Sequence, residues 1–270
     1  MSDFPYLHGF SEKEQQRLRD QAEFLEWIVY QDVNLSQAKS LLEVGCGVGA
    51  QTEILLRRFP HVHVTAIDLN PVQLGAAQKN LQSLSGLQNR WDLQQMSGSA
   101  LTFGDQSFDS TFLCWILEHV PAPTEILAEV KRVLRPGGEI YITEVMNSSF
   151  FLDPYSPNVW KYWTALNDYQ FDQAGDPFVG VKLGNMLKST GFHDIQTTVK
   201  TMHFDNRQAE QRKSAIDYWT ELMLSAADSL LAAKYIDEEI LEGTKNELTA
   251  VALDPNAVFF YSFMQARAKA

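Results

Sequence analysis

Apolar residues along the chain occur in two arrangements. In some segments they form short continuous runs, and in others single apolar residues recur every three to four positions. Continuous runs predict β-strands, and the longer spacing predicts amphipathic helices. The predicted strands cover residues 40–44, 62–67, 87–95, 107–114 and 139–146. The predicted helices between them cover residues 49–59, 71–84 and 122–134. This alternation predicts a doubly wound α/β fold, in which a mostly parallel sheet carries helices on both faces.

Further elements are predicted on both sides of this alternating region. Ser11-Glu-Lys-Glu14 is a capping box, and it predicts a helix of about five turns before the first strand. After residue 150 we expect a helix at 180–190, a strand at 192–202, a long helix over 207–242 and a last strand at 257–267. We find no internal repeat, low-complexity tract or linker, so residues 1–270 are predicted to form a single domain.

Residues 150–178 interrupt this regular pattern with a high density of aromatic side chains. The stretch holds nine of them, whereas the chain average of 11% gives about three in a segment of this length. The same stretch has one lysine, Lys161, and four aspartates, which are Asp153, Asp168, Asp172 and Asp176. Rings together with carboxylates suit a cationic or amine-bearing organic ligand, through cation–π and ionic contacts.

Composition and charge narrow the classes of function. The chain has 22 Lys and Arg against 34 Asp and Glu, so its formal net charge is −12 and its pI is near 4.9. Without a dense basic cluster, this balance argues against a nucleic-acid substrate and against an anionic membrane surface. Cys46 and Cys114 suggest neither a disulfide scaffold nor a metal site, and no metal is expected. Because the start lacks a secretory signal and no apolar run reaches spanning length, we expect a cytoplasmic protein.

The most specific chemical signal is a glycine-rich turn between the first strand and the helix that follows it. Gly45, Gly47 and Gly49 occupy alternate positions in this turn, and the second strand ends at Asp68. Glycine lets the backbone turn tightly and approach a ligand without interference from Cβ. An aspartate at the end of the neighbouring strand can accept both hydroxyls of a ribose. The chain is therefore predicted to bind a compound built on adenosine.

Two cofactor templates fit this turn, and four further segments favour one of them. As G-x-G-x-x-A the turn matches the dinucleotide fingerprint; as E-x-G-x-G-x-G, starting at Glu43, it resembles motif I of class I S-adenosylmethionine-dependent methyltransferases. The other segments that resemble this family, in its order and spacing, are Ala66-Ile-Asp68-Leu-Asn70, Phe103-Gly-Asp-Gln-Ser-Phe-Asp109, Leu117-Glu-His-Val120 and Leu134-Arg-Pro-Gly-Gly138. By this resemblance the chain is identified as a member of that family. The opening Tyr6-Leu-His8-Gly-Phe-Ser-Glu-Lys-Glu14 resembles the N-terminal lid segment of the branch that acts on small molecules.

The resemblance implies a Rossmann-like, seven-stranded sheet whose last strand, at 257–267, is antiparallel, and S-adenosyl-L-methionine as the cofactor. The residues expected at the cofactor are Glu43, Gly45, Cys46, Gly47, Gly49, Asp68, Leu69, Ser97, Gly98, Cys114, Trp115, Gln21 and Arg17. Among them, Glu43 is expected to brace the glycine turn by accepting its N–H groups, and this structural role and direct contact with the cofactor are equally open. Ser97 stands where the family often has an acid for the adenine amino group, so only one hydroxyl is available there.

The resemblance also implies that helical segments cover a small organic acceptor, which the residue content suggests to be amine-bearing. The expected covering segments are a lid helix within 1–35 and insertions at 150–180 and 205–250. The expected acceptor-binding residues are Tyr6, His8, Tyr155, Trp160 and Trp163. If the reaction needs a general base, His119 is the first candidate and Glu144 the second, although a histidine at a helix start that is satisfied by a neighbour stays open for His119.

Two other functions stay open on the sequence. The chain could methylate an oxygen, nitrogen or carbon atom of a protein or peptide instead of a small molecule. It could also bind the cofactor without transferring a methyl group, as a partner protein. The sequence assigns neither the attacked atom nor an oligomeric state.

Overall fold

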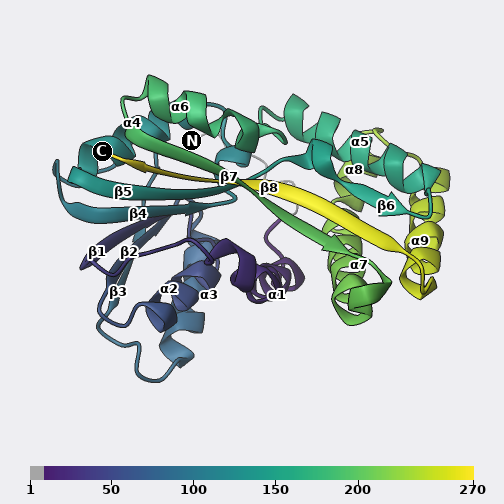
Figure 1. The fold of residues 1–270 in the computed structure, drawn as a ribbon, viewed down its shortest axis with the longest axis horizontal. Coiled ribbons are helices and arrows are strands. Elements are labelled where there is room, and N and C mark those ends of the chain that lie inside the picture. The colour runs from purple at the N-terminus through teal and green to yellow at the C-terminus, as the bar shows by residue number, and fades with distance from the viewer. Residues whose placement is uncertain (1–8) are drawn as a thin grey trace.

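The central sheet has eight strands within residues 9–270, the part of the chain that the structure, a computed structural model, describes (Figure 1). The strands are β1 (Ser40–Val44), β2 (His63–Asp68), β3 (Trp91–Gln95), β4 (Phe108–Cys114), β5 (Leu134–Val145), β6 (Phe151–Asp153), β7 (His193–Phe204) and β8 (Val258–Lys269). The α-helices are α1 (Glu12–Val29), α2 (Ala50–Arg58), α3 (Pro71–Ser83), α4 (Pro123–Val133), α5 (Pro157–Asp172), α6 (Leu183–Ser189), α7 (Ala209–Leu224), α8 (Ala227–Ala232) and α9 (Glu238–Leu253). The short 3₁₀ turns are η1 (Leu117–His119), η2 (Asn147–Ser149), η3 (Val179–Lys182) and η4 (Asn206–Gln208).

The strand order is β3-β2-β1-β4-β5-β8-β6, and β7 lies along the other edge of β8. Strands β1 to β5 are parallel to one another, whereas β8 is antiparallel to β5, β6 and β7. The doubly wound, mostly parallel sheet with an antiparallel last strand is therefore confirmed. One short strand, β6, was not predicted, because its three residues lie inside the aromatic segment.

Helices cover both faces of the parallel part of the sheet, with α1, α2 and α3 on one face and α4 and α6 on the other (Figure 1). Because both faces are covered, β1 reads as a continuous apolar run, and its Leu41 and Leu42 are fully buried. The Ser11 cap is also present, since the Ser11 side chain accepts a hydrogen bond from Glu14 N at 3.2 Å where α1 begins, while the Glu14 carboxylate binds Arg17. Among residues 9–270, no helix is both long and apolar enough to cross a membrane.

The long helix expected over 207–242 is wrong, because this segment forms three helices, α7, α8 and α9. The break after α8 falls at Lys234, whose φ of 62° lies in the left-handed region that no helix continues. Three residues later the Asp237 side chain accepts a hydrogen bond from Ile240 N at 2.8 Å and begins α9. The apolar spacing runs through both breaks without a Gly or Pro, so periodicity alone did not reveal them.

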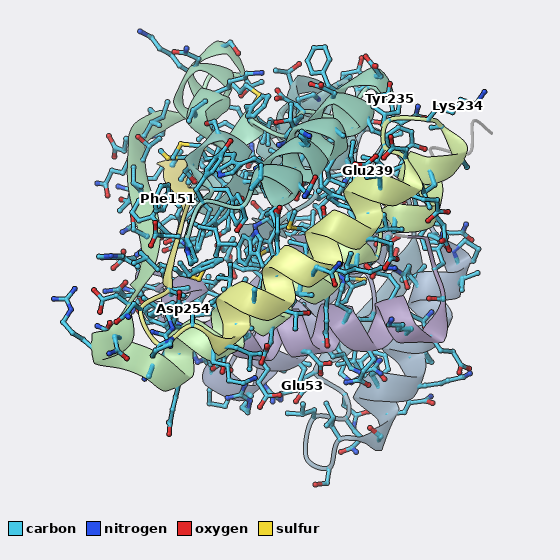
Figure 2. The ribbon with its side chains drawn as sticks, turned by 90° about the vertical axis from the view of Figure 1, so that its right-hand side faces the viewer. Glu53, Phe151, Lys234, Tyr235, Glu239 and Asp254 are labelled. Carbon is cyan, nitrogen blue, oxygen red and sulfur yellow. The ribbon has the colours of Figure 1, made fainter. Side chains whose placement is uncertain are left out.

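Strands β7 and β8, of twelve residues each, extend beyond the parallel strands and carry a second helical layer (Figure 1). In Figure 2, α9 crosses the face of this layer from Glu239 to Asp254. Glu247 of α9 accepts hydrogen bonds from the N–H groups of Asn158 and Val159 at 2.8 and 3.0 Å, so it caps the start of α5. The helices α5, α7 and α9 are thereby held beside the carboxyl edge of the parallel strands.

Candidate functional site

The glycine turn after β1 is fixed to the end of β2. Gly45 N and Cys46 N both donate to Ile67 O, at 2.8 and 2.9 Å. Gly45 has a φ of 75°, and a Cβ built on it would lie 2.3 Å from Cδ1 of Ile116, so both the backbone conformation and the space require glycine. At Gly47, with a φ of 52°, a Cβ would meet no atom within 4 Å. The turn is therefore closely packed at its start and open where it faces the cavity described below.

Asp68 connects the glycine turn to the start of α3. Its Oδ2 accepts a hydrogen bond from Gly47 N at 2.8 Å, and its Oδ1 accepts one from Asn70 N at 2.8 Å. Burial raises the pKa of this carboxyl, while the hydrogen bonds from Asn70, Gly47 and Leu69 lower it in part. A carboxylate has about four lone-pair positions, so at least one remains beyond these three bonds to accept a ligand hydroxyl.

Glu43 does not hold the glycine turn in the way that the sequence suggested. Its carboxylate is 2% exposed, accepts a hydrogen bond from the Thr52 hydroxyl at 2.6 Å, and does not line the cavity. Burial raises its pKa to about 7, against the opposing effect of the Thr52 hydrogen bond. The N–H groups of the turn bind Ile67 O and Asp68 instead, so Glu43 connects β1 to α2.

A cavity of about 990 Å³ begins at this edge of the sheet and continues beneath α1, α5 and α7. Its outer part is formed by the segments that follow β1, β2, β3 and β4. Of the residues expected at the cofactor, those on its wall are Arg17, Gln21, Gly45, Cys46, Gly47, Asp68, Leu69, Ser97, Gly98, Cys114 and Trp115. The Leu69 side chain is 59% exposed, which leaves an apolar surface beside Asp68 for a ligand to cover.

Gly49 does not line the cavity, and it has a packing role instead. A Cβ at this position would lie 3.1 Å from Cβ of Ala77, so the glycine lets α3 approach the start of α2. Cys114 and Trp115 continue the wall from the end of β4, and Trp115 N donates to Thr143 O at 2.9 Å. Burial raises the pKa of the Cys114 thiol well above its usual range, so it stays protonated.

The two candidate bases occupy different places. His119 lines the cavity at the end of η1, with Nε2 3.7 Å from Oε1 of Glu118. Glu144 is fully buried and does not line the cavity; its carboxylate accepts the N–H groups of Ile116, Leu117 and Glu118 at 3.0, 2.7 and 3.3 Å. Burial, and then the charge of Glu118, raise its pKa well above normal. The proposal of Glu144 as a base is therefore wrong on position, because this side chain satisfies the start of η1.

The inner part of the cavity is lined by aromatic side chains, and only one of the described candidates for acceptor binding is among them. Trp163 lines the cavity, and its Nε1 donates to Asn147 O at 2.9 Å. Trp160 instead packs on Phe150, with ring centroids 5.8 Å apart, and Tyr155 is 74% exposed, so neither reaches the cavity wall. Tyr6 and His8 lie outside the described residues.

The four aspartates of the aromatic segment also lie away from the cavity wall. Asp172 accepts a hydrogen bond from the Tyr235 hydroxyl, and Asp176 pairs with Lys182. The sequence reasoning missed the polar residues Glu118 and Gln170 and the rings of Tyr218, Trp219, Tyr261 and Phe263, all of which line the cavity. A signal for Glu118 was available, since it precedes His119 in the same motif. Among residues 9–270, no three His, Cys, Asp or Glu side chains are placed to hold a metal ion.

A parallel sheet with a glycine turn and an acid at the ends of its first two strands defines the class of Rossmann-like, nucleoside-binding proteins. Residues 42–142 match the family model of the methyltransferase domain. The chain is 37% identical over 114 residues to a ubiquinone biosynthesis O-methyltransferase of Xylella fastidiosa, a match that covers 42% of this chain and 44% of the relative. On these matches, residues 42–142 of the chain are similar to the methyltransferase domain, which is the family that the glycine turn and its accompanying motifs resemble.

Solved structures agree with this fold. A putative methyltransferase from Bacillus halodurans superposes with a TM-score of 0.54 at 18% identity, over 93% of this chain and 98% of that one. The [4+2]-cyclase SpnF superposes with a TM-score of 0.52 at 20% identity, over 93% and 82%. At such identities the likeness concerns the fold alone. For three curated methyltransferases that the chain matches, the aligned part is between 31% and 49% of the relative's own length.

Proposed function

We propose that the chain transfers a methyl group from S-adenosylmethionine to an oxygen, nitrogen or carbon atom of a small organic molecule. The observation that carries this proposal is the continuity of one cavity. The same space is lined at one end by Gly47 and Asp68 and at the other by Trp163, Tyr218 and Tyr261. A nucleoside cofactor and a ring-bound acceptor would therefore share one chamber, which direct transfer between them requires.

The residues on the wall fit the cofactor. Asp68 has a free lone pair for a ribose hydroxyl, Leu69 offers an exposed apolar face to adenine, and the open side of Gly47 leaves room for the ligand next to the backbone. Arg17 and Gln21 on α1 are the candidates for the carboxylate of the methionyl part, and their side chains are joined by a 2.9 Å hydrogen bond. When bound, the cofactor would supply a methyl group on a positively charged sulfur, which is a good leaving group.

Because the leaving group is already activated, the protein's main task in this proposal is to orient the acceptor and exclude water. Alignment of two reacting groups contributes roughly 7–11 kcal/mol to lowering a barrier. The rings of Trp163 and Tyr261 are positioned for this by one buried residue, Asn147, which accepts from Trp163 Nε1 on its carbonyl and from the Tyr261 hydroxyl on Oδ1. Where the acceptor atom must lose a proton, His119 on the cavity wall is the candidate to take it.

Incubation of the protein with methyl-labelled cofactor and a fractionated metabolite extract tests the proposal. Label in a small molecule is the expected result, and label in polypeptide would replace this proposal with peptide methylation. A cofactor that binds while nothing becomes labelled would overturn methyl transfer. The fold by itself does not imply methyl transfer, since SpnF, which shares it, is a [4+2]-cyclase.

A further inference from the structure

Glu118 is a nearly buried carboxylate on the cavity wall, and the methyl transfer proposed above gives it no role. It lies in η1, immediately before His119, and 7% of its surface is exposed. Moving an ionised carboxylate out of water is costly unless a cation or several hydrogen-bond donors meet it. Its surroundings therefore indicate what the cavity is built to bind.

The Glu118 side chain is held in place from the segment that covers the cavity. Gln170 of α5 donates from Nε2 to Oε2 of Glu118 at 2.9 Å and to its backbone carbonyl at 3.2 Å. Asp176 N donates to the same carbonyl at 2.8 Å. The other carboxylate oxygen, Oε1, has His119 Nε2 at 3.7 Å, which is beyond hydrogen-bond distance. The carboxylate is thus oriented by Gln170, a neutral donor, and His119 lies within ion-pair distance of it when the imidazole is protonated.

Four titratable groups near Glu118 are shifted towards their neutral forms. Burial raises the pKa values of the Cys114 thiol, the Glu144 carboxyl and the hydroxyls of Tyr218 and Tyr261, and the negative charge of Glu118 raises each of them further. Arg17, a cation that also lines the cavity, is bound to Glu14 through two hydrogen bonds of 2.7 and 2.6 Å. Arg17 also lowers the pKa of Tyr218 in part, so the described cavity wall around Glu118 combines His119 and Arg17 with neutral polar groups and rings.

Aromatic rings form much of the cavity wall that Glu118 shares, and two of them, Tyr218 and Tyr261, are near enough for its charge to raise their pKa values. The rings are Trp115, Trp163, Tyr218, Trp219, Tyr261 and Phe263. The face of an aromatic ring attracts a cation, most strongly where water is excluded. A carboxylate set among rings thus offers a positive charge both an ion pair and several cation–π contacts.

We propose that Glu118 and the surrounding rings bind a positively charged nitrogen of the methyl acceptor, so that the acceptor is an amine or an ammonium compound. This inference rests on the proposed methyl transfer, since it assigns the inner part of the cavity to the acceptor. The sequence had suggested the four aspartates of the aromatic segment as the carboxylates that meet this charge, but they lie away from the cavity wall. Glu118, which the sequence reasoning did not single out, takes their place in this inference.

Two isosteric probes test this inference without knowledge of the natural acceptor. In the presence of S-adenosylhomocysteine, phenyltrimethylammonium and the uncharged tert-butylbenzene are titrated into the wild-type protein by calorimetry. We expect the cation to bind at least about tenfold more tightly, which corresponds to 1.4 kcal/mol. Glu118→Gln keeps the shape of the side chain and should lower this preference severalfold, to what the rings alone supply. Glu239→Gln makes the same change on the exposed start of α9 (Figure 2) and should keep it.

A second arm identifies which positive charge Glu118 meets. S-adenosylmethionine and S-adenosylhomocysteine differ in the charge on sulfur, so their affinity ratio should be the same in the wild-type and Glu118→Gln proteins. A ratio that changes severalfold, together with an unaltered preference between the two probes, would mean that Glu118 faces the sulfonium and would overturn the inference. Should Glu118→Gln not fold, Glu118→Asp keeps the charge but withdraws it from the cavity, and it should lower the preference for the cation.

The outcomes for the two proposals can be separated. A wild-type protein that binds neither S-adenosylmethionine nor S-adenosylhomocysteine contradicts the proposed function. A wild-type protein that binds both, but does not prefer phenyltrimethylammonium over tert-butylbenzene, contradicts the inference about Glu118 and leaves methyl transfer standing.

Discussion

The backbone N–H of Gly47 donates a 2.8 Å hydrogen bond to Oδ2 of Asp68, which lies 21 positions later in the chain. This bond joins the two features from which a nucleoside site was predicted, the glycine turn and the acid at the end of β2. Asp68 consequently has two tasks, to shape the turn and to present an oxygen lone pair to a ligand. Substitutions at this position can separate them.

We expect Asp68→Ala to weaken the binding of S-adenosylhomocysteine by at least an order of magnitude, because buried ligand hydroxyls and Gly47 N both lose their acceptor. Asp68→Asn keeps one carbonyl oxygen for Gly47 N, so it should retain more of the turn while still weakening binding. Calorimetric titration measures both effects. Asp92→Asn, a matched change on an exposed residue of β3, serves as the control. Unchanged affinity in Asp68→Ala would remove the ribose assignment.

Gly45→Ala should destabilise the protein by more than the usual cost of a left-handed alanine, about 1–2 kcal/mol. The added Cβ would lie 2.3 Å from Cδ1 of Ile116, whereas a Cβ at Gly86, which has a similar φ of 81°, meets nothing within 4 Å. Gly86→Ala therefore measures the backbone cost alone. Urea unfolding of the two variants gives the difference.

The steric part of this cost can be checked separately. Ile116→Val removes Cδ1, the atom nearest to the added methyl group, so it should recover part of the stability of Gly45→Ala. Equal stabilities of Gly45→Ala and Gly86→Ala would show that Ile116 moves aside freely.

Glu43 should make stability fall as the pH rises from about 4.5 to about 7. Its pKa is near 7 in the folded protein and 4.5 in the unfolded chain, so in this range the folded state binds more protons and deprotonation favours unfolding. This loss of unfolding free energy is complete above the pKa of the folded protein. It amounts to about 3 kcal/mol, at 1.36 kcal/mol for each unit by which the pKa is raised.

Glu43→Gln cannot ionise, and it keeps an oxygen for the Thr52 hydroxyl. The difference in unfolding free energy between this variant and the wild type should therefore grow in favour of the variant between pH 5 and pH 8. Subtracting the wild-type curve removes the contribution of other groups. A difference that does not depend on pH would show that Glu43 is ionised throughout.

Glu144 should matter for stability through the turn that it caps. Glu144→Ala leaves the N–H groups of Ile116, Leu117 and Glu118 without their acceptor, at about 1–3 kcal/mol for each buried one, so we expect a large fall in melting temperature. Glu144→Gln resembles the protonated carboxyl and keeps an oxygen, so it should cost much less. Similar melting temperatures for Glu144→Ala and Glu144→Gln would contradict this role.

The parallel half of the sheet was predictable because its signals are local. Leu41 and Leu42 belong to an apolar run that only a strand covered on both faces buries completely, and Ser11 caps α1 three residues before Glu14. The division of residues 207–242 was not predictable from spacing, since the apolar positions continue through it. It depends on the left-handed conformation of Lys234 and on a cap by Asp237.

The residues of the candidate site also differ in how far the sequence could predict them. Trp160 and Trp163 are three positions apart on α5, and periodicity treats them alike, yet only Trp163 reaches the cavity. Which of the two rings lines a chamber depends on how α5 packs against β8 and η2. Glu144 is a similar case, because a carboxylate at a strand end can face either a ligand or the N–H groups of a neighbouring turn.

The sequence by itself determined the parallel sheet and the nucleoside-binding edge, because three alternate glycines and the acid that ends the next strand act through the local backbone. Only the tertiary structure decided what surrounds the acceptor. Glu118, Gln170 and Tyr261 come from η1, α5 and β8, which are far apart in the chain. The spacing of apolar residues predicts that a side chain is buried, but it does not predict which groups that side chain contacts. The chemistry of the cavity therefore follows from packing between distant segments, which no local pattern encodes.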